Sequence, residues 1–395
     1  MNNSTTEKFF SEQKEKSKIK TFIVTEFFKT YYSILSNCGK TKNGFIYMDL
    51  FSGPGTYDDG TESTPIVLLD TIDKLNKNIL QEIEMIFNDE NKSYYESLVT
   101  SIQNHRVYNE MKNKPVIHNL SAKDVDVKKY LCSGKPIFSF IDPWGYKDIS
   151  ANQIKDFVTA IGSDCILFFN VNRILQDLSK ATSESHMRKI FGDEYDNAKK
   201  ISKDSLLSQN KKSRAFVKAF SKNLYDKEFK NLKAKGYRLF VLPFEFKQDS
   251  TDKTSHFLLF ISKNHKAILE MKRIMVAQSN SFGDELSYHG KNALNMCFFS
   301  RKDNLFINIE NNIKKMFSAQ PALLHKEETI AKWFELMDAY SMNQEYTVTP
   351  YTFNEFQTAI KQMDAKGFIS VTSPVKRIRI TQKATIKFNK EIMEN

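Results

Sequence analysis

Short β-rich runs in the first half of the chain are each followed by residue types that can bind a ligand. The first is the segment Asp49-Leu-Phe-Ser-Gly-Pro-Gly55, which lies in and after the run Phe45–Phe51. Gly53 and Gly55 allow a turn that brings backbone N–H groups close to a ligand, and Phe51 lies in the same turn. Asp49 has the charge to accept a ligand ammonium group. A GxG turn alone is common, but its place after the first strand of a series favours a binding site.

Acidic residues follow the next two β-rich runs. Asp89 comes directly after the run Glu84–Phe87, where an acid can accept both hydroxyls of a ribose. Asp124 follows the run Pro115–Asn119, where an acid can face an adenine amine. Acids at such positions are also common helix N-caps that face solvent, so both interpretations stay open.

The fourth run, Pro136–Ile141, leads into the segment Asp142-Pro-Trp-Gly-Tyr146. Asp142 can accept a hydrogen bond from a planar amine, and Pro143 constrains the turn. Trp144 and Tyr146 offer rings that can stack on such a substrate. A buried tryptophan of the plain core is the alternative.

The alternation of β-rich runs with helical stretches predicts an α/β fold: a doubly wound, Rossmann-like sheet with helices on both faces. The run Cys165–Val171 continues the series. Tyr237–Phe246 and His256–Ser262 are joined by a short polar connector, which predicts an antiparallel pair. Between the run Cys165–Val171 and this pair, residues 175–236 are Lys-rich and helical, which indicates an insertion over the sheet edge. Its charge is either a solvated face or a lid that faces an anion.

We divide the chain into an N-terminal helical segment (1–40), the α/β domain (41–312) and a winged helix-turn-helix domain (313–395). In the last, Thr352-Phe-Asn-Glu355 is a capping box that opens a helix. Residues 368–371 and 375–380 are expected to pair as a hairpin.

Three basic residues fall on this hairpin. Lys376, Arg377 and Arg379 are placed to reach nucleic-acid phosphates, whereas a winged helix that only docks protein is the alternative.

Composition adds weaker constraints. The net charge of +11 is compatible with a nucleic-acid partner, but also with a Lys-rich protein that binds none. The four cysteines and seven histidines show no metal-ligand spacing, so we expect no metal site. The polar beginning of the chain and the short apolar runs predict no signal peptide, no membrane contact and a cytoplasmic protein.

Together, the four ligand-binding segments resemble those of Rossmann-like S-adenosylmethionine-dependent methyltransferases. Asp142-Pro-Trp-Gly145 is similar to the Asp-Pro-Pro-Tyr motif of amino-methylating enzymes. It departs from that motif because Trp144 replaces the second proline and the aromatic residue is displaced to Tyr146.

A closer resemblance is to the three-Cys-motif partner family (TcmP), over about residues 19–277 and the helical tail. The motifs that carry it are Asp49-Leu-Phe-Ser-Gly-Pro-Gly55, Ser63-Thr-Pro65, Asp142-Pro-Trp-Gly145, and His256–Ser262 followed by Met271-Lys272. The resemblance implies a methyltransferase-like domain that binds S-adenosylmethionine and works beside a partner protein with a three-cysteine motif.

The function we predict is methyl transfer from S-adenosylmethionine to a nitrogen of a nucleic-acid base. An adaptor that keeps the cofactor pocket without turnover is the alternative. A remote one is a metal-dependent nuclease, since Glu245-Phe-Lys247 has E-x-K spacing, but no Pro-Asp lies at a suitable distance upstream.

Overall fold

A computed structural model of the chain describes residues 3–248, 253–280, 285–290, 305–372 and 384–389, with the side chains of the first helix described from Glu15 onward. Its centre is an eight-stranded sheet in the order β3-β2-β1-β4-β5-β7-β6-β8. The strands are β1 (Phe45–Asp49), β2 (Ile83–Asn88), β3 (Val116–His118), β4 (Ile137–Ile141), β5 (Asp164–Asn170), β6 (Phe240–Lys247), β7 (Thr254–Ser262) and β8 (Ser287–Tyr288). β7 runs antiparallel to both its neighbours, and the other adjacent strands are parallel. The predicted α/β fold and the antiparallel pair are confirmed, and the sheet is mostly parallel.

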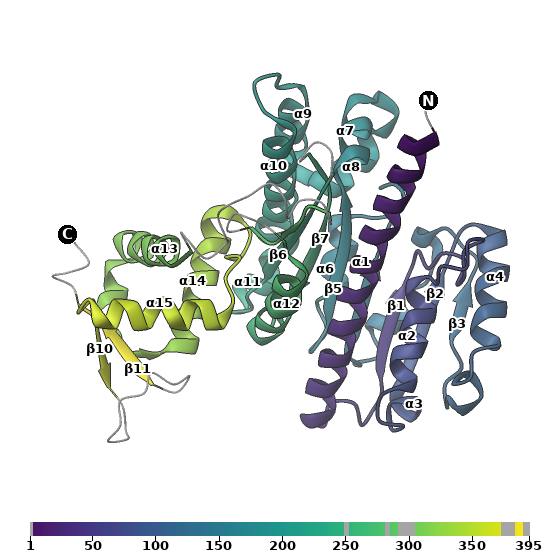
Figure 1. Cartoon of the computed structure of the whole chain (residues 1–395), viewed down its shortest axis with the longest axis horizontal. Helices are drawn as coiled ribbons and strands as arrows, with labels where there is room; N and C mark the ends of the chain where they lie inside the picture. Colours follow the sequence, from purple (N-terminus) through teal and green to yellow (C-terminus); the bar gives the residue numbers. More distant parts are fainter. Residues whose placement is uncertain (1–2, 249–252, 281–284, 291–304, 373–383, 390–395) are drawn as a thin grey trace.

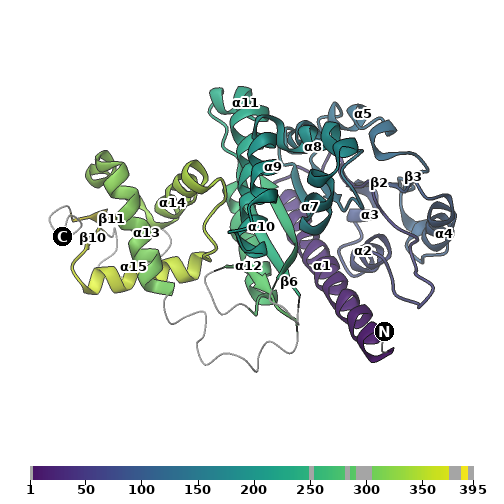
Figure 2. The ribbon, with the colours of Figure 1, turned by 90° about the horizontal axis from the view of Figure 1, so that it is seen from above.

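Helices lie on both sides of this sheet (Figure 1). They are α1 (Asn3–Asn37), α2 (Thr64–Asp73), α3 (Ile79–Glu82), α4 (Lys92–Gln103), α5 (Lys128–Leu131), α6 (Ala151–Phe157), α7 (Val171–Ser179), α8 (Glu184–Phe191), α9 (Tyr195–Lys203), α10 (Gln209–Lys222), α11 (Lys230–Ala234) and α12 (His265–Gln278). Figure 2 shows α1 and α2 on one side, and α8 and α11 on the other.

The first helix is part of the α/β body and not a separate segment, which corrects the predicted boundary at residue 40. The ring of Phe27 lies 5.3 Å from that of Phe138 on β4 and 4.6 Å from that of Phe260 on β7. Both contacts are buried, so α1 covers the centre of one sheet face.

The predicted helical insertion over residues 175–236 corresponds mainly to α8–α11. It does not lie over the sheet edge, because α10 and the preceding α7 both contact β7, an inner strand. The insertion therefore covers the second face of the sheet.

The C-terminal unit has its own apolar core. Its elements are α13 (Leu305–Ala319), β9 (Glu328–Thr329), α14 (Ile330–Glu345), α15 (Phe353–Ala365), β10 (Ile369–Thr372) and β11 (Thr385–Phe388). The predicted capping box is confirmed, with Thr352 and Glu355 bonded reciprocally. The core begins at Leu305, so the predicted boundary at residue 312 falls inside α13 and has to move upstream.

Of the two strands of the predicted hairpin, only the first, at residues 368–371, is confirmed, as β10. β10 pairs antiparallel with β11, and the predicted partner at 375–380 lies outside the described residues. Lys376, Arg377 and Arg379 lie there too.

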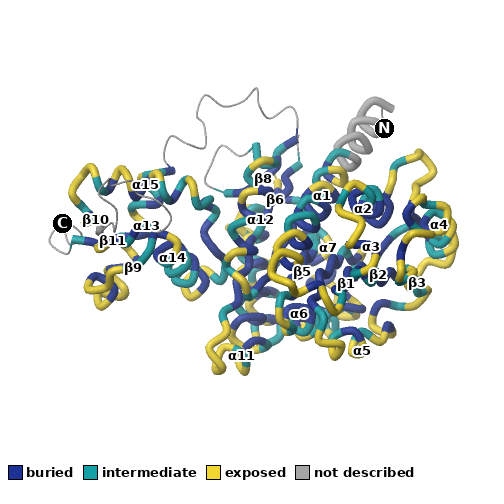
Figure 3. The backbone as a smooth tube through the Cα atoms, turned by 90° about the horizontal axis from the view of Figure 1, so that it is seen from below, coloured by how far each residue is buried: buried dark blue, intermediate teal, exposed yellow. Residues whose placement is uncertain are grey.

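Figure 3 shows buried residues along the central strands and exposed ones on outer helices such as α4 and α11. Within the described ranges, no helix combines the length and the apolar character needed to cross a membrane.

Candidate functional site

A cavity of about 790 Å³ opens where β1, β2 and β4 end. β1 and β4 are neighbours in the sheet, but from β1 the chain continues to β2 and β3 on one side and later to β5 on the other. At such a reversal of strand order, the loops that follow two neighbouring strands run in opposite directions and leave a crevice between them. Ligands of open α/β sheets bind in this crevice. Predicted residues that line the cavity are Phe51, Asp89, Trp144 and Tyr146.

The glycine turn after β1 is held by its surroundings. Gly53 and Gly55 have φ of 69° and 82°, a region that favours glycine. The Gly53 N–H donates to an Asp89 carboxylate oxygen over 2.9 Å. A Cβ on Gly55 would lie 2.9 Å from Ser101 of α4, so close packing on that helix also requires this glycine.

Buried Asn88, the last residue of β2, forms hydrogen bonds with the loops that follow β1 and β3. Its side-chain amide donates to the carbonyl oxygens of Leu50 and Leu120 over 3.0 Å each, and its amide oxygen accepts from the Leu120 N–H. The backbone of the loops after β1 and β3 is thus fixed to the end of β2.

Asp89 lies on this frame and faces the cavity. Its second carboxylate oxygen accepts from the Asn91 N–H over 2.9 Å. The N-cap of α4 is Asn91, not Asp89. Each Asp89 oxygen therefore has one backbone donor, and a carboxylate oxygen has room for a second one.

Asp49 is buried below the turn. One carboxylate oxygen accepts from the Phe51 N–H over 3.0 Å, and the other is buried with no hydrogen-bond partner among the described residues. Burial raises the pKa of Asp49 to about 8; the Phe51 bond lowers it, and the charge of Asp142 raises it. The carboxyl group is mostly protonated at neutral pH and is short of one polar partner.

The turn after β4 orients its residues differently from what we predicted. Trp144 is 86% exposed and is not core, whereas Tyr146 is buried. The Tyr146 hydroxyl accepts from the Asn170 N–H over 2.7 Å, which locks its ring in the wall of the cavity. Of the two rings, only that of Trp144 is exposed and could stack on a substrate, and Tyr146 is corrected to a wall residue.

Asp142 and Pro143 do not line the cavity. Pro143 is buried, and Asp142 forms an ion pair with Lys20 of α1. The Lys20 ammonium also lies 4.9 Å from the centre of the Phe168 ring. The predicted acceptor carboxylate is thus paired with a cation.

Asp124 is exposed in a short turn after β3 and does not line the cavity, although Ala122 of the same turn does. Its solvent-facing interpretation fits this position better than an adenine contact.

Sequence reasoning missed several residues of the wall, among them Tyr94, Arg173 and His186. Arg173 lies close to Gly145, where a Cβ would approach the guanidinium to 3.4 Å. Its Nε donates to Asp177 over 3.0 Å. Arg173 and Asp177 follow the fifth β-rich run and are four residues apart, so they share one face of the helix. This spacing was a signal in the sequence that could have identified the pair.

The E-x-K segment belongs to a separate network on β6. Glu245 is buried and accepts from Arg214 over 3.0 Å and from the Thr254 hydroxyl. Among the residues that the structure describes, no group of three or more His, Cys, Asp or Glu is placed to hold a metal ion.

Comparisons with known proteins give little. No family model matches the chain, and no curated protein matches it. Among solved structures, it is similar to the crystal structure of protein LPL1258 from Legionella pneumophila str. Philadelphia 1, of family DUF519. The identity is 10%, over 65% of this chain and 90% of that one, with a TM-score of 0.32. We base no inference on a likeness of this degree.

Proposed function

We propose that the cavity binds S-adenosylmethionine and that the protein transfers its methyl group to a nitrogen of a nucleic-acid base. The observation that carries this proposal is the cavity itself, at the reversal of strand order, with Phe51, Asp89 and Trp144 in its wall. The order β3-β2-β1-β4-β5 supports a Rossmann-like sheet of the nucleotide-binding kind.

The residues present suit the cofactor. Asp89 would accept from the ribose hydroxyls, and the turn at Gly53 and Gly55 would lie against the cofactor. The unpartnered oxygen of Asp49 is the observation that favours a ligand ammonium group, since a buried polar atom without a partner is costly. Asp49 does not line the cavity, so the ammonium group would have to reach below the turn, where its charge would favour the ionised carboxylate. S-adenosylmethionine supplies an electrophilic methyl group when bound.

For the acceptor, exposed Trp144 would stack on a base and Asp142 would accept from its amine. A base within a duplex would have to be flipped out to reach them. The C-terminal order of helix, strand, two helices and a strand pair supports a winged helix, whose predicted role is to hold the nucleic acid. The family resemblance adds a three-cysteine-motif protein as partner.

A non-catalytic adaptor is the second candidate, and the Lys20–Asp142 ion pair favours it. A carboxylate already paired with an ammonium group is a weaker acceptor for a substrate amine. In this case the cavity would bind the cofactor without turnover.

Formation of S-adenosylhomocysteine separates the two candidates. Wild type is incubated with S-adenosylmethionine and DNA or RNA, with and without cell extract that supplies a partner. We expect Asp142→Asn and Trp144→Ala each to lower the rate at least about tenfold, with cofactor affinity within about twofold of wild type. Leu206→Ala, which removes another exposed side chain, is the control. No product with wild type in any mixture would favour the adaptor.

A further inference from the structure

A second cavity of about 450 Å³ adjoins the first, and Lys147 and Asp148 line both. We propose that it binds the phosphates of a single-stranded nucleic acid whose base enters the larger cavity beside Trp144. This inference rests on the proposed function, because it identifies the acceptor as a strand with a phosphodiester backbone.

The first observation is charge. Five basic side chains line this second cavity, against the two acidic ones of Asp148 and Glu228. The basic residues are Lys123, Lys147, Arg188, Lys189 and Lys227. An excess of positive charge in a concave site concentrates anions there.

The second observation is which of these cations are free. Lys147 lies 2.9 Å from Glu90, Arg188 lies 2.8 Å from Glu184, and Lys227 lies 2.6 Å from Asp193. Lys123 and Lys189, by contrast, form no ion pair with any residue that the structure describes. They come from different elements, the turn after β3 and α8, so two unneutralised ammonium groups line one cavity.

One neutral donor, the side-chain amide of Gln153, completes the lining. Ser150 caps α6, and its hydroxyl donates to the side-chain oxygen of Gln153 over 3.1 Å, so its own hydrogen is already used. This contact leaves the NH₂ group of Gln153 without a partner among the described residues. Lysine and amide side chains are among the groups that usually bind phosphate oxygens in nucleic-acid complexes.

The position of the cavity favours a single-stranded nucleic acid as its ligand over a free anion. The Asp142-Pro-Trp-Gly145 turn is separated from Lys147 only by Tyr146, so exposed Trp144 and the cationic cavity follow each other along one loop. Single-stranded nucleic acids are bound by this combination, an aromatic ring under a base and cations along the backbone.

The test is fluorescence anisotropy with labelled oligothymidylate and oligouridylate of about ten nucleotides, titrated over a salt series. Each lost phosphate contact flattens the slope of log K against log salt by about 0.7 for a single strand. Lys123→Ala/Lys189→Ala should therefore flatten the slope by about 1.4 and weaken binding roughly tenfold at low salt. Lys40→Ala/Lys42→Ala removes two exposed lysines just before β1, at the amino end of this strand and not at the carboxyl end where the cavity lies, and should match wild type.

Calorimetry with S-adenosylhomocysteine on the same variants keeps the two proposals apart. Normal cofactor binding with an unchanged salt slope would overturn the phosphate site alone. A flattened slope without any cofactor binding would support the phosphate site and contradict the proposed function. Complete displacement of the oligonucleotide by millimolar inorganic phosphate would contradict binding of a nucleic-acid strand and would assign the cavity to a free anion.

Discussion

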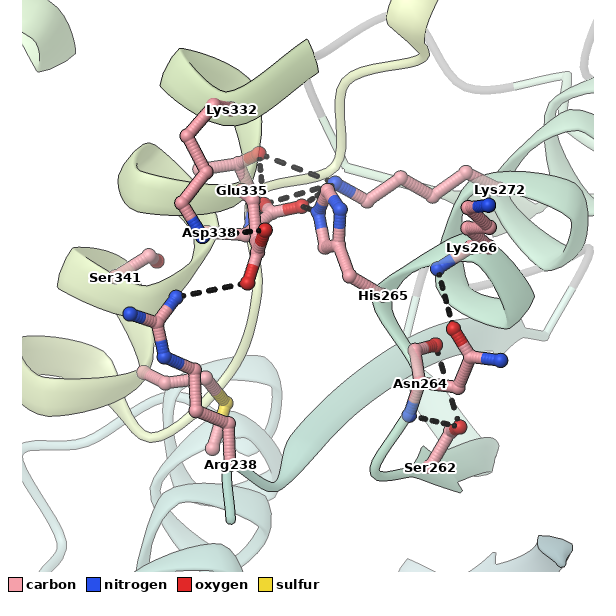
Figure 4. A network of polar contacts seen from close by, with 12 residues as sticks. Arg238, Ser262, Asn264, His265, Lys266, Lys272, Lys332, Glu335, Asp338 and Ser341 are labelled. Carbon is pink, nitrogen blue, oxygen red and sulfur yellow. Dashed lines mark hydrogen bonds and ion pairs between the residues drawn. The ribbon is translucent and has the colours of Figure 1, made fainter. Parts of the chain in front are cut away.

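The ammonium group of Lys272 lies 2.7 Å from a carboxylate oxygen of Asp338, and both side chains are fully buried. Lys272 belongs to α12 and Asp338 to α14, so the pair joins the sheet to the C-terminal unit (Figure 4). His265 lies 2.8 Å from the same carboxylate, and the Thr349 hydroxyl donates to it over 2.7 Å. Burial raises the pKa of Asp338, but the Lys272 charge and the His265 contact outweigh it and hold the pKa below its usual value.

Breaking this pair should destabilise the protein strongly. Asp338→Asn leaves the Lys272 charge buried without its counter-ion, which typically costs about 3–5 kcal/mol. The free energy of unfolding from urea denaturation measures the cost. Arg273→Ala, which breaks the exposed pair with Glu270 on the same helix, should change that free energy by less than about 1 kcal/mol. Equal small effects for both variants would show that the buried pair contributes little.

Asp49 should make the stability depend on pH. Its pKa is about 8 in the fold and near 4 in the unfolded chain, so the folded state binds the extra proton between these values. The contribution of Asp49 to stability is present below pH 4 and is lost as pH rises through 8. Asp49→Asn cannot ionise, so relative to wild type it should gain on the order of 4 kcal/mol between pH 5 and 9.

Urea denaturation at several pH values measures this gain. Asp196→Asn, at a site 80% exposed on α9, should show a nearly constant difference from wild type. If the difference between Asp49→Asn and wild type is also constant from pH 5 to 9, Asp49 is not protonated in the fold.

The sheet and the edge that holds the cavity were predictable because the apolar runs are short, bounded and separated by helical stretches. Strand ends of such runs meet at one edge, so Phe51, Asp89 and Trp144 could be grouped without coordinates. The capping box at Thr352 was predictable for a similar reason, since its two bonds are local.

The parts that failed depend on contacts between distant segments or on turn geometry. Lys20 and Asp142 are 122 residues apart, and no local pattern relates them. Trp144 and Tyr146 are both aromatic, and only the path of the turn decides that one is exposed and the other buried. The boundary at 312 failed because the composition changes after α13 has begun, whereas its apolar face already belongs to the second core.

Binding of S-adenosylhomocysteine, measured by calorimetry, tests the central claim most directly. We predict saturable binding to wild type and a loss of about ten- to hundredfold in Asp89→Asn, because a hydrogen bond to a charged acceptor is worth about 1.5–3 kcal/mol. Asp196→Asn should bind like wild type. The absence of heat with wild type, and of competition by S-adenosylmethionine, at ligand concentrations up to the millimolar range would contradict the cofactor site and the function built on it.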